Sequence, residues 1–281
     1  MMNALEIRGL HKVRKGFTLH IDELTLPGGC IMGLIGENGA GKSTTIGLIL
    51  GSLQKDGGTI RVLGHEDVAA VKQDLGVVLD EVGFHDYLTA EKIGKIMADI
   101  FTRWDDDLYR QYLVQLSLPR DKAFKEFSKG MKMKLGIAVA LSHHPKLLLL
   151  DEATSGLDPV VRDELLDIFA DFTRDEEHSI LISSHIVSDL EKICDYVAFL
   201  HKGKLMLCEE KDTLRDSFGV WRGSSEQLSL LPSAAVYGKR VNAYGVEALV
   251  RRDAVPAGTE LGNVGIEELF IFMAKEESHH L

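Results

Sequence analysis

The segment from Gly36 to Thr44 constrains the fold of this chain more than any other stretch. It reads Gly-Glu-Asn-Gly-Ala-Gly-Lys-Ser-Thr and matches the pattern G-x-x-x-x-G-K-S/T. An apolar run from 30 to 35 precedes it and predicts a buried strand, whereas the run from 45 to 50 is typical of a helix. A glycine-rich loop between a strand and a helix predicts a site that wraps the phosphates of a nucleotide.

Each residue type in this loop suits the binding of a phosphate chain. Glycines let backbone N–H groups turn inward, and the new helix adds unpaired N–H groups at its positive end. We expect Lys42 to reach the β- and γ-phosphates and the Ser43 hydroxyl to help hold Mg²⁺. The residues expected to bind the nucleotide are Gly36, Glu37, Asn38, Gly39, Ala40, Gly41, Lys42, Ser43 and Thr44. The alternative is a glycine-rich turn with a chance Lys-Ser pair, and both flanks argue against it.

Charge and composition exclude several classes of protein. The net charge of −11 disfavours a nucleic-acid groove, which needs a basic face, so we expect no nucleic-acid partner. Cys30, Cys194 and Cys208 are too few for a disulfide framework and lack zinc spacing, which indicates reduced thiols in the cytosol. The N-terminus lacks the features of a signal peptide, and no apolar run is long enough to span a bilayer. Any work at a membrane would therefore need a second chain.

Strand and helix patterns alternate through most of the chain. Residues 4 to 35 are β-rich, and strand-like runs return at 147–150, 179–183 and 196–200. A helix is expected at about 159–174, between two of these runs. Strands that alternate with helices predict a mostly parallel sheet.

A helical insert is expected at about residues 84–145. Its first helix, with Thr89 as N-cap, carries apolar residues at steps of three and four. These residues are Ile93, Ile96, Met97, Ile100, Phe101 and Trp104. A second helix is expected at about 106–117, with Leu108, Tyr112, Leu113 and Leu116 on one face.

The composition changes after about residue 213. Residues 217–233 are rich in Ser and Gly, residues 241–250 have a strand-like pattern, and residues 266–275 resemble a short helix. We expect a separate appendage here, either regulatory, in contact with a second subunit, or simply stabilising. The adjacent His279 and His280 do not by themselves indicate a metal site.

An apolar strand that ends in two acids lies about a hundred residues after the phosphate loop. The run from Lys146 to Leu150 leads into Asp151 and Glu152. Asp151 is placed to hold Mg²⁺ through water, and Glu152 to orient or deprotonate an attacking water. The alternative is a strand that simply leaves the core at a solvated Asp-Glu turn.

Three further motifs occur in a fixed order with the two already described. They are Phe127-Ser128-Lys129-Gly130-Met131, which opens a helix, then Ser155-Gly156-Leu157-Asp158-Pro159, and finally Ile182-Ser183-Ser184-His185. In this order the motifs resemble the nucleotide-binding domains of ABC transporters over residues 4–212. Each later motif is weak alone, and their order carries the resemblance.

The resemblance implies an α/β fold of the ABC type of P-loop NTPase. It would have a mixed core sheet flanked by helices, an N-terminal antiparallel β subdomain and a helical subdomain at about 84–145. The ATPase domain would cover 1–212, and a small α+β appendage would cover 213–281. The resemblance also implies a Mg²⁺-dependent ATPase that pairs head to tail with a second copy around two ATP molecules. Its other partner would be an integral membrane subunit, at the cytoplasmic face of the membrane.

The resemblance also assigns roles to individual residues. Ser128 and Gly130 would meet the γ-phosphate bound by the second subunit, and Asp158 would align the two subunits. His185 would contact the γ-phosphate and help hold the water that Glu152 activates. The catalytic residues would then be Glu152 and His185, together with the loop lysine, Lys42.

Several positions depart from the usual pattern of the family. Lys129 stands in a signature that is usually Leu-Ser-Gly-Gly-Gln, and Asp80 occupies the place of a glutamine that binds Mg²⁺. A carboxylate at Asp80 can also bind Mg²⁺, but it adds negative charge near a triphosphate. The usual adenine-stacking aromatic is absent near Arg14, so the candidates are Phe17, which is equally well explained as a core residue, and Arg14 itself.

The signature and the acids at residues 80 and 81 look most like the ATPases of bacterial exporters for drugs and peptide antibiotics. A soluble ABC-type ATPase switch on ribosomes or DNA is the alternative. Such switches usually have two ATPase domains in one chain or a long coiled coil before the signature, and this chain has neither. A catalytically silent module is a third hypothesis, disfavoured because Glu152 and His185 are both present.

Overall fold

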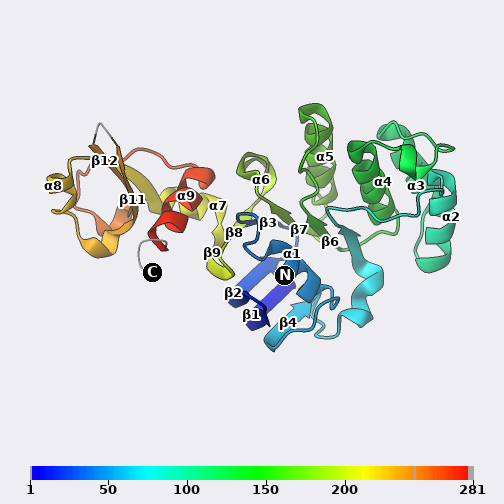
Figure 1. Cartoon of the computed structure of the whole chain (residues 1–281), viewed down its shortest axis with the longest axis horizontal. Helices are drawn as coiled ribbons and strands as arrows, with labels where there is room; N and C mark the ends of the chain where they lie inside the picture. Colours follow the sequence, from blue (N-terminus) through cyan, green and yellow to red (C-terminus); the bar gives the residue numbers. More distant parts are fainter. Residues whose placement is uncertain (1, 243–244, 278–281) are drawn as a thin grey trace. The chain divides into compact units, whose positions relative to one another are not determined.

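The structure is a computed structural model and describes residues 2–242 and 245–277. The chain divides into two compact units, one ending at Cys208 and the other beginning at Glu209 (Figure 1). The boundary expected between residues 212 and 213 falls inside α7 (Lys211–Ser217), a helix of the second unit. His279 and His280 lie outside the described residues.

A nine-stranded sheet forms the framework of the first unit, in the order β4-β1-β2-β9-β8-β3-β7-β6-β5. The strands are β1 (Asn3–Arg14), β2 (Phe17–Pro27), β3 (Ile31–Ile35), β4 (Gly57–Val62), β5 (Leu75–Val78), β6 (Leu147–Asp151), β7 (Ser179–Ser184), β8 (Tyr196–His201) and β9 (Lys204–Glu210). β1 pairs antiparallel with β2 and β4, whereas β3, β5, β6, β7 and β8 pair in parallel. This arrangement confirms the predicted mixed sheet with an antiparallel N-terminal part.

The sequence of each strand reflects how many of its faces are covered. Every residue of β3 and β6 is buried, which explains their continuous apolar runs. In β2 the buried residues Leu19 and Ile21 alternate with the exposed His20 and Asp22, since one face of this strand meets solvent. The two patterns distinguish the centre of the sheet from its antiparallel part.

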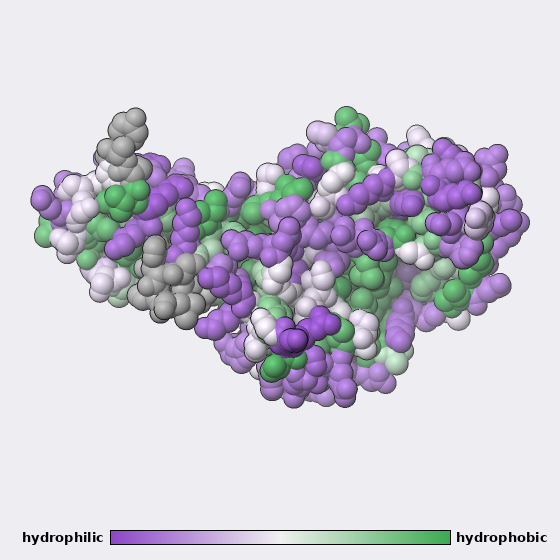
Figure 2. Space-filling model, in the orientation of Figure 1, coloured by the Kyte–Doolittle hydropathy of each residue, from purple (hydrophilic) through white to green (hydrophobic). Residues whose placement is uncertain are grey.

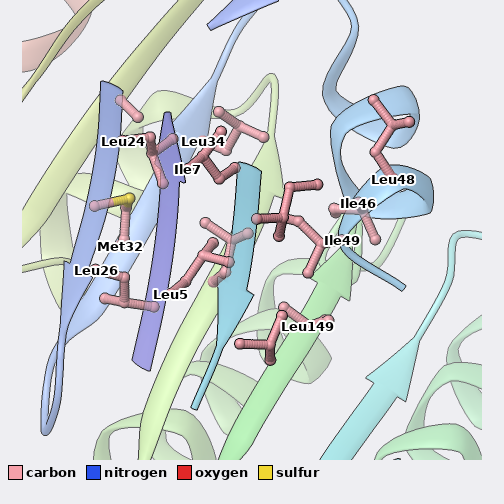
Figure 3. Packing of buried hydrophobic residues seen from close by; sticks show 14 of the residues in the cluster. Leu5, Ile7, Leu24, Leu26, Met32, Leu34, Ile46, Leu48, Ile49 and Leu149 are labelled. Atoms are coloured by element: carbon pink, nitrogen blue, oxygen red, sulfur yellow. The ribbon is translucent and has the colours of Figure 1, made fainter. Parts of the chain in front are cut away.

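The main core lies between the sheet and α1 (Lys42–Ile49). Figure 3 shows Ile46 and Ile49 of this helix pointing toward the strands, close to Leu149 of β6. These three side chains are at most 1% exposed. Because each fully buried aliphatic side chain contributes about 1.5–3 kcal/mol, this packing holds the start of α1 firmly at the end of β3.

The helical insert consists of α2 (Ala90–Ile100), α3 (Asp106–Gln115) and α4 (Lys129–Leu141), which lie side by side (Figure 1). Thr89 caps α2, because its hydroxyl accepts a hydrogen bond from the Lys92 N–H at 3.3 Å. Within the face predicted for α2, Ile93 is buried but Ile100 is 54% exposed. Figure 2 shows hydrophobic surface among hydrophilic residues on the side that carries α2.

The prediction that Phe101 and Trp104 continue the face of α2 is wrong, because the helix ends at Ile100. The side-chain oxygen of Gln73, in the short helix η1 (Val68–Asp74), accepts a hydrogen bond from the Thr102 N–H at 3.0 Å. This contact holds the chain in a non-helical path. Phe101 stacks instead on His143, with ring centroids 3.9 Å apart.

The second unit contains a three-stranded antiparallel sheet in the order β10-β12-β11. Its elements are β10 (Phe218–Gly223), α8 (Ser225–Leu228), β11 (Val236–Asn242), β12 (Gly245–Arg251) and α9 (Ile266–Glu277), with α9 packed on β11. The sequence did not predict β10, because residues 217–233 are rich in Ser and Gly. In this strand Trp221 is buried and belongs to a small core with Val246, Ala248 and Val250. The α+β class expected for this part is therefore observed.

Two more helices complete the first unit, α5 (Pro159–Phe172) after β6 and α6 (Val187–Ile193) after β7. None of the helices in the described part of the chain is both long and apolar enough to cross a bilayer.

Candidate functional site

The phosphate loop connects β3 to α1, and its glycines are required by its geometry. Gly41, immediately before α1, has a φ of 112°, which side chains other than that of glycine rarely allow. A Cβ on Gly36 would lie 2.4 Å from the carbonyl oxygen of Leu200, so this position has no room for a side chain. The loop is thus packed tightly against the end of β8.

Lys42, the first residue of α1, is only 5% exposed. Its Nζ donates hydrogen bonds to the carbonyl oxygens of Gly36 at 2.7 Å and Glu37 at 3.2 Å. The same Nζ lies 3.1 Å from Oε1 of Glu152, which follows β6. The charge of the loop lysine therefore faces the acidic end of the neighbouring strand.

Glu152 bridges two of the expected catalytic residues. While its Oε1 faces Lys42, its Oε2 lies 2.8 Å from Nδ1 of His185, the residue that follows β7. Glu152 itself has a φ of 53°, in the left-handed region, and its side chain is 13% exposed. Strained backbone of this kind is often found at functional sites. The arrangement brings together Lys42, Glu152 and His185 from three parts of the chain.

Ser183 organises the two acids, although its role was not predicted. Its hydroxyl donates to Oδ1 of Asp151 at 2.6 Å and accepts from the Glu152 N–H at 3.1 Å. Asp151 lies opposite Ser183 in the parallel pairing of β6 and β7. The available signal was a serine near the end of a strand expected to lie beside the acidic one.

An open pocket of about 660 Å³ lies over the loop. It is lined by Arg14, Lys15, Phe17, Asn38, Gly39, Gly41, Lys42, Ser43, Thr44, Asp80 and Glu152. The volume falls within the range of about 300–1,000 Å³ that is usual for small-molecule sites. The pocket therefore brings the N-terminal strands, the phosphate loop, Asp80 and Glu152 to one place, and Lys15 is a wall residue that the sequence did not single out.

Phe17 occupies both of the environments considered for it. Its Cζ lies 2.9 Å from the point where a Cβ on Gly41 would stand, so the ring packs directly on the phosphate loop. The side chain is half-buried and also packs against the main core. Arg14 lines the same pocket. Both candidates for adenine stacking thus line the pocket, and the contact with adenine stays a prediction.

The three residues expected to bind metal all supply oxygen atoms, the ligands that Mg²⁺ prefers. Asp151 is 6% exposed, whereas Asp80 is 54% exposed and lines the pocket together with Ser43. Within residues 2–242 and 245–277, no group of three or more His, Cys, Asp or Glu side chains could hold a metal alone. The donor set fits a Mg²⁺ ion whose remaining ligands are phosphate oxygens and water.

Ser128, Gly130 and Asp158 do not line this pocket. Ser128 caps α4 and accepts a hydrogen bond from the Met131 N–H at 3.2 Å, and Asp158 caps α5 in the same way. Around Gly130 there is space, because a Cβ there would meet no atom closer than 3.8 Å. Any contact of these residues with a nucleotide would therefore be with one bound elsewhere than in this pocket.

Comparison with known proteins identifies the family. The family model described as ABC transporter matches residues 19–155. An uncharacterized ABC transporter ATP-binding protein of Bacillus subtilis (strain 168), YhcH, is 31% identical over 276 residues, which are 93% of this chain and 88% of that protein. This chain belongs to the ABC transporter ATP-binding proteins. The resemblance inferred from the order of its motifs is thereby confirmed.

Two further ABC relatives carry names that mention a cargo. The lantibiotic transport ATP-binding protein SrtF of Streptococcus pyogenes is 35% identical over 210 residues, 74% of this chain and 91% of that protein. The bacitracin transport ATP-binding protein BcrA of Bacillus licheniformis is 37% identical over 183 residues, 63% of this chain and 60% of that protein.

A solved structure described as the ATP binding subunit of an ABC transporter is 28% identical, with a TM-score of 0.65. The match covers 75% of this chain and 92% of that one. The chain is therefore an ATP-binding subunit of an ABC transporter, with the ATPase fold of that family.

Proposed function

We propose that this subunit hydrolyses ATP with Mg²⁺ as a homodimer, at the cytoplasmic face of a membrane, and drives a separate integral membrane exporter. The observation that carries the catalytic part is the contact of Glu152 with both Lys42 and His185 beside the phosphate loop. The names of SrtF and BcrA support a cargo such as a peptide antibiotic.

Binding of the triphosphate would begin at Lys42 and at the first N–H groups of α1. Mg²⁺, held by Ser43, by Asp80 and through water by Asp151, would neutralise charge on the phosphates. The Nζ of Lys42 lies 3.1 Å from the Glu152 carboxylate. A phosphate that binds this ammonium would therefore compete with Glu152 for it. Glu152 would then be released to orient a water, while His185 continues to hold its other oxygen.

The second subunit would complete each site. Ser128 and Gly130 lie at the start of α4, where the space around Gly130 gives close access to the backbone. There the positive end of α4 can meet the phosphates of the opposite nucleotide. Asp158, at the start of α5, would align the two copies.

The test of the catalytic part is the variant Glu152→Gln. We expect it to lose ATP turnover while it retains ATP binding, because glutamine keeps the shape of the side chain but cannot act as a base. Turnover that continues at the wild-type rate would exclude Glu152 as the catalytic base.

Co-purification tests whether the subunit has a membrane partner. The subunit is purified from native membranes that have been gently solubilised, and the proteins that accompany it are identified. A multi-span membrane protein in stoichiometric amount is the expected result. Recovery of ribosomes or DNA would favour the alternative of a soluble ATPase switch, and saturable binding to nucleic acid at physiological salt would contradict our proposal.

A further inference from the structure

Two of the positions that depart from the usual ABC motifs face each other in the structure. The Nζ of Lys129 lies 3.5 Å from Oδ1 of Asp80, although the two residues are 49 positions apart. Lys129 is the first residue of α4, and Asp80 follows β5. Their charges are opposite. The unusual lysine in the signature and the unusual acid near the phosphate loop therefore form one ion pair.

Asp80 lies at the border of two pockets. It lines the phosphate-loop pocket with Lys42, Ser43 and Glu152. It also lines a second pocket of about 450 Å³, together with Glu81, Val82, Phe127, Lys129, Lys132 and Met133. A bare carboxylate at this border would repel a triphosphate, because like charges a few ångströms apart disfavour each other. The ammonium of Lys129 offsets that repulsion from the side of the signature.

The ammonium of Lys129 also lies beside the loop that leads to Asp158. A Cβ on Gly156 would stand 3.3 Å from Nζ of Lys129. Gly156 has a φ of 68°, so glycine is favoured there for its backbone as well. The lysine thus lies between Asp80 and a glycine whose missing side chain leaves room for it.

We propose that Lys129 is a positioning residue for Asp80. It holds the carboxylate at the edge of the phosphate pocket and cancels its repulsion of the triphosphate bound by the same subunit. Because the ion pair uses Oδ1, the second oxygen of Asp80 is left for Mg²⁺ or its water. This inference deepens the proposed function and rests on it for the position of the metal.

A double-mutant cycle on nucleotide binding tests this proposal. The variants are Lys129→Met, Asp80→Asn and the two combined, and the measured quantity is the dissociation constant of Mg²⁺ and a non-hydrolysable ATP analogue by calorimetry. Exposed ion pairs contribute up to about 1 kcal/mol, so we expect Lys129→Met to weaken binding about threefold to fivefold. In the Asp80→Asn background the same change should alter binding by less than about twofold.

Two further variants test whether the effect comes from a cation next to Asp80, rather than from the loss of any positive charge or from damage to the structure. Lys129→Arg should bind the nucleotide about as tightly as the wild type, because it keeps a cation next to Asp80. Lys132→Met is the matched control, since Lys132 lines the same second pocket but places its Nζ over the Phe124 ring, 4.8 Å from the centroid. We expect it to leave nucleotide binding unchanged. Lys129 and Asp80 are both about half exposed, so the variants should fold.

The outcomes distinguish this inference from the proposed function. The inference would be overturned if Lys129→Met weakened nucleotide binding equally in the wild-type and Asp80→Asn backgrounds. This holds whether or not Mg²⁺ contributes to binding. Binding of the analogue by the wild type that does not depend on Mg²⁺ would contradict the proposed metal site. In that case the cycle would still decide the inference, because the charge of Asp80 acts on the triphosphate with or without the metal.

Discussion

The contact between Lys42 and Glu152 predicts that Glu152→Gln tightens ATP binding in addition to stopping turnover. The two charged groups are 3.1 Å apart, and their side chains are only 5% and 13% exposed. Before its phosphates can engage Lys42 fully, ATP must displace this carboxylate. Glutamine would weaken the competing contact, and Lys42 would still donate to the carbonyls of Gly36 and Glu37.

The size of the effect follows from this geometry. Two unit charges at this distance attract by about 5 kcal/mol at an effective dielectric constant of about 20, before desolvation is subtracted. A hydrogen bond to a charged group contributes about 1.5–3 kcal/mol net, roughly twice as much as a bond between neutral groups. The contact with glutamine keeps the charge of Lys42, so the loss is at most about half of this contribution, up to about 1.5 kcal/mol. The ATP dissociation constant should therefore be up to about tenfold lower in Glu152→Gln.

Calorimetric titration of wild type and Glu152→Gln with Mg²⁺ and a non-hydrolysable ATP analogue measures this difference. Glu164→Gln is the matched control, because Glu164 also pairs with a buried lysine, Lys134, at 2.6 Å but lies outside the pocket. We expect no change in affinity from the control. An affinity in Glu152→Gln equal to or weaker than that of the wild type would refute the competition between Glu152 and the phosphates.

Two predictions concern the scaffold. Gly36→Ala should lower the melting temperature by several degrees and abolish ATP binding in a thermal-shift assay, because its Cβ would lie 2.4 Å from the Leu200 carbonyl oxygen. Gly83→Ala is the control, since no atom lies within 4 Å of its Cβ, and an equal effect of both changes would contradict the steric argument. Tyr109→Phe should cost about 1 kcal/mol of unfolding free energy near pH 8 in urea, because the buried hydroxyl donates to the Ala90 carbonyl oxygen at 2.8 Å. Burial raises the pKa of Tyr109, so the folded protein keeps the phenol proton to higher pH than the unfolded chain, where tyrosine titrates near about 10. The wild type should therefore lose this stability above about pH 10, and a difference between the two proteins that does not shrink there would contradict this assignment.

Local patterns were sufficient to predict alternating strands and helices and the phosphate loop, whereas the ABC fold with its mixed sheet followed from the order of the motifs. The loop lies between β3 and α1 as expected, because the glycine spacing and the flanking apolar runs act within one short segment. The helix α2 illustrates the limit of such patterns. Its apolar period continued to Trp104, but the hydrogen bond from Thr102 to Gln73 ended the helix at Ile100. A contact across 29 positions overrode the local preference.

By itself, the sequence determined the alternation of strands and helices in the ATPase part, the ABC family resemblance and the residue types available at the site. Only the tertiary structure decided which of these residues meet. Lys42 contacts Glu152, and Asp80 contacts Lys129, because parallel strands and the helical insert bring together the ends of segments that are distant in the chain. The physical reason is that backbone geometry and hydrophobic period act over a few residues. Ion pairs between distant segments depend instead on the packing of the whole core, which a linear pattern does not specify.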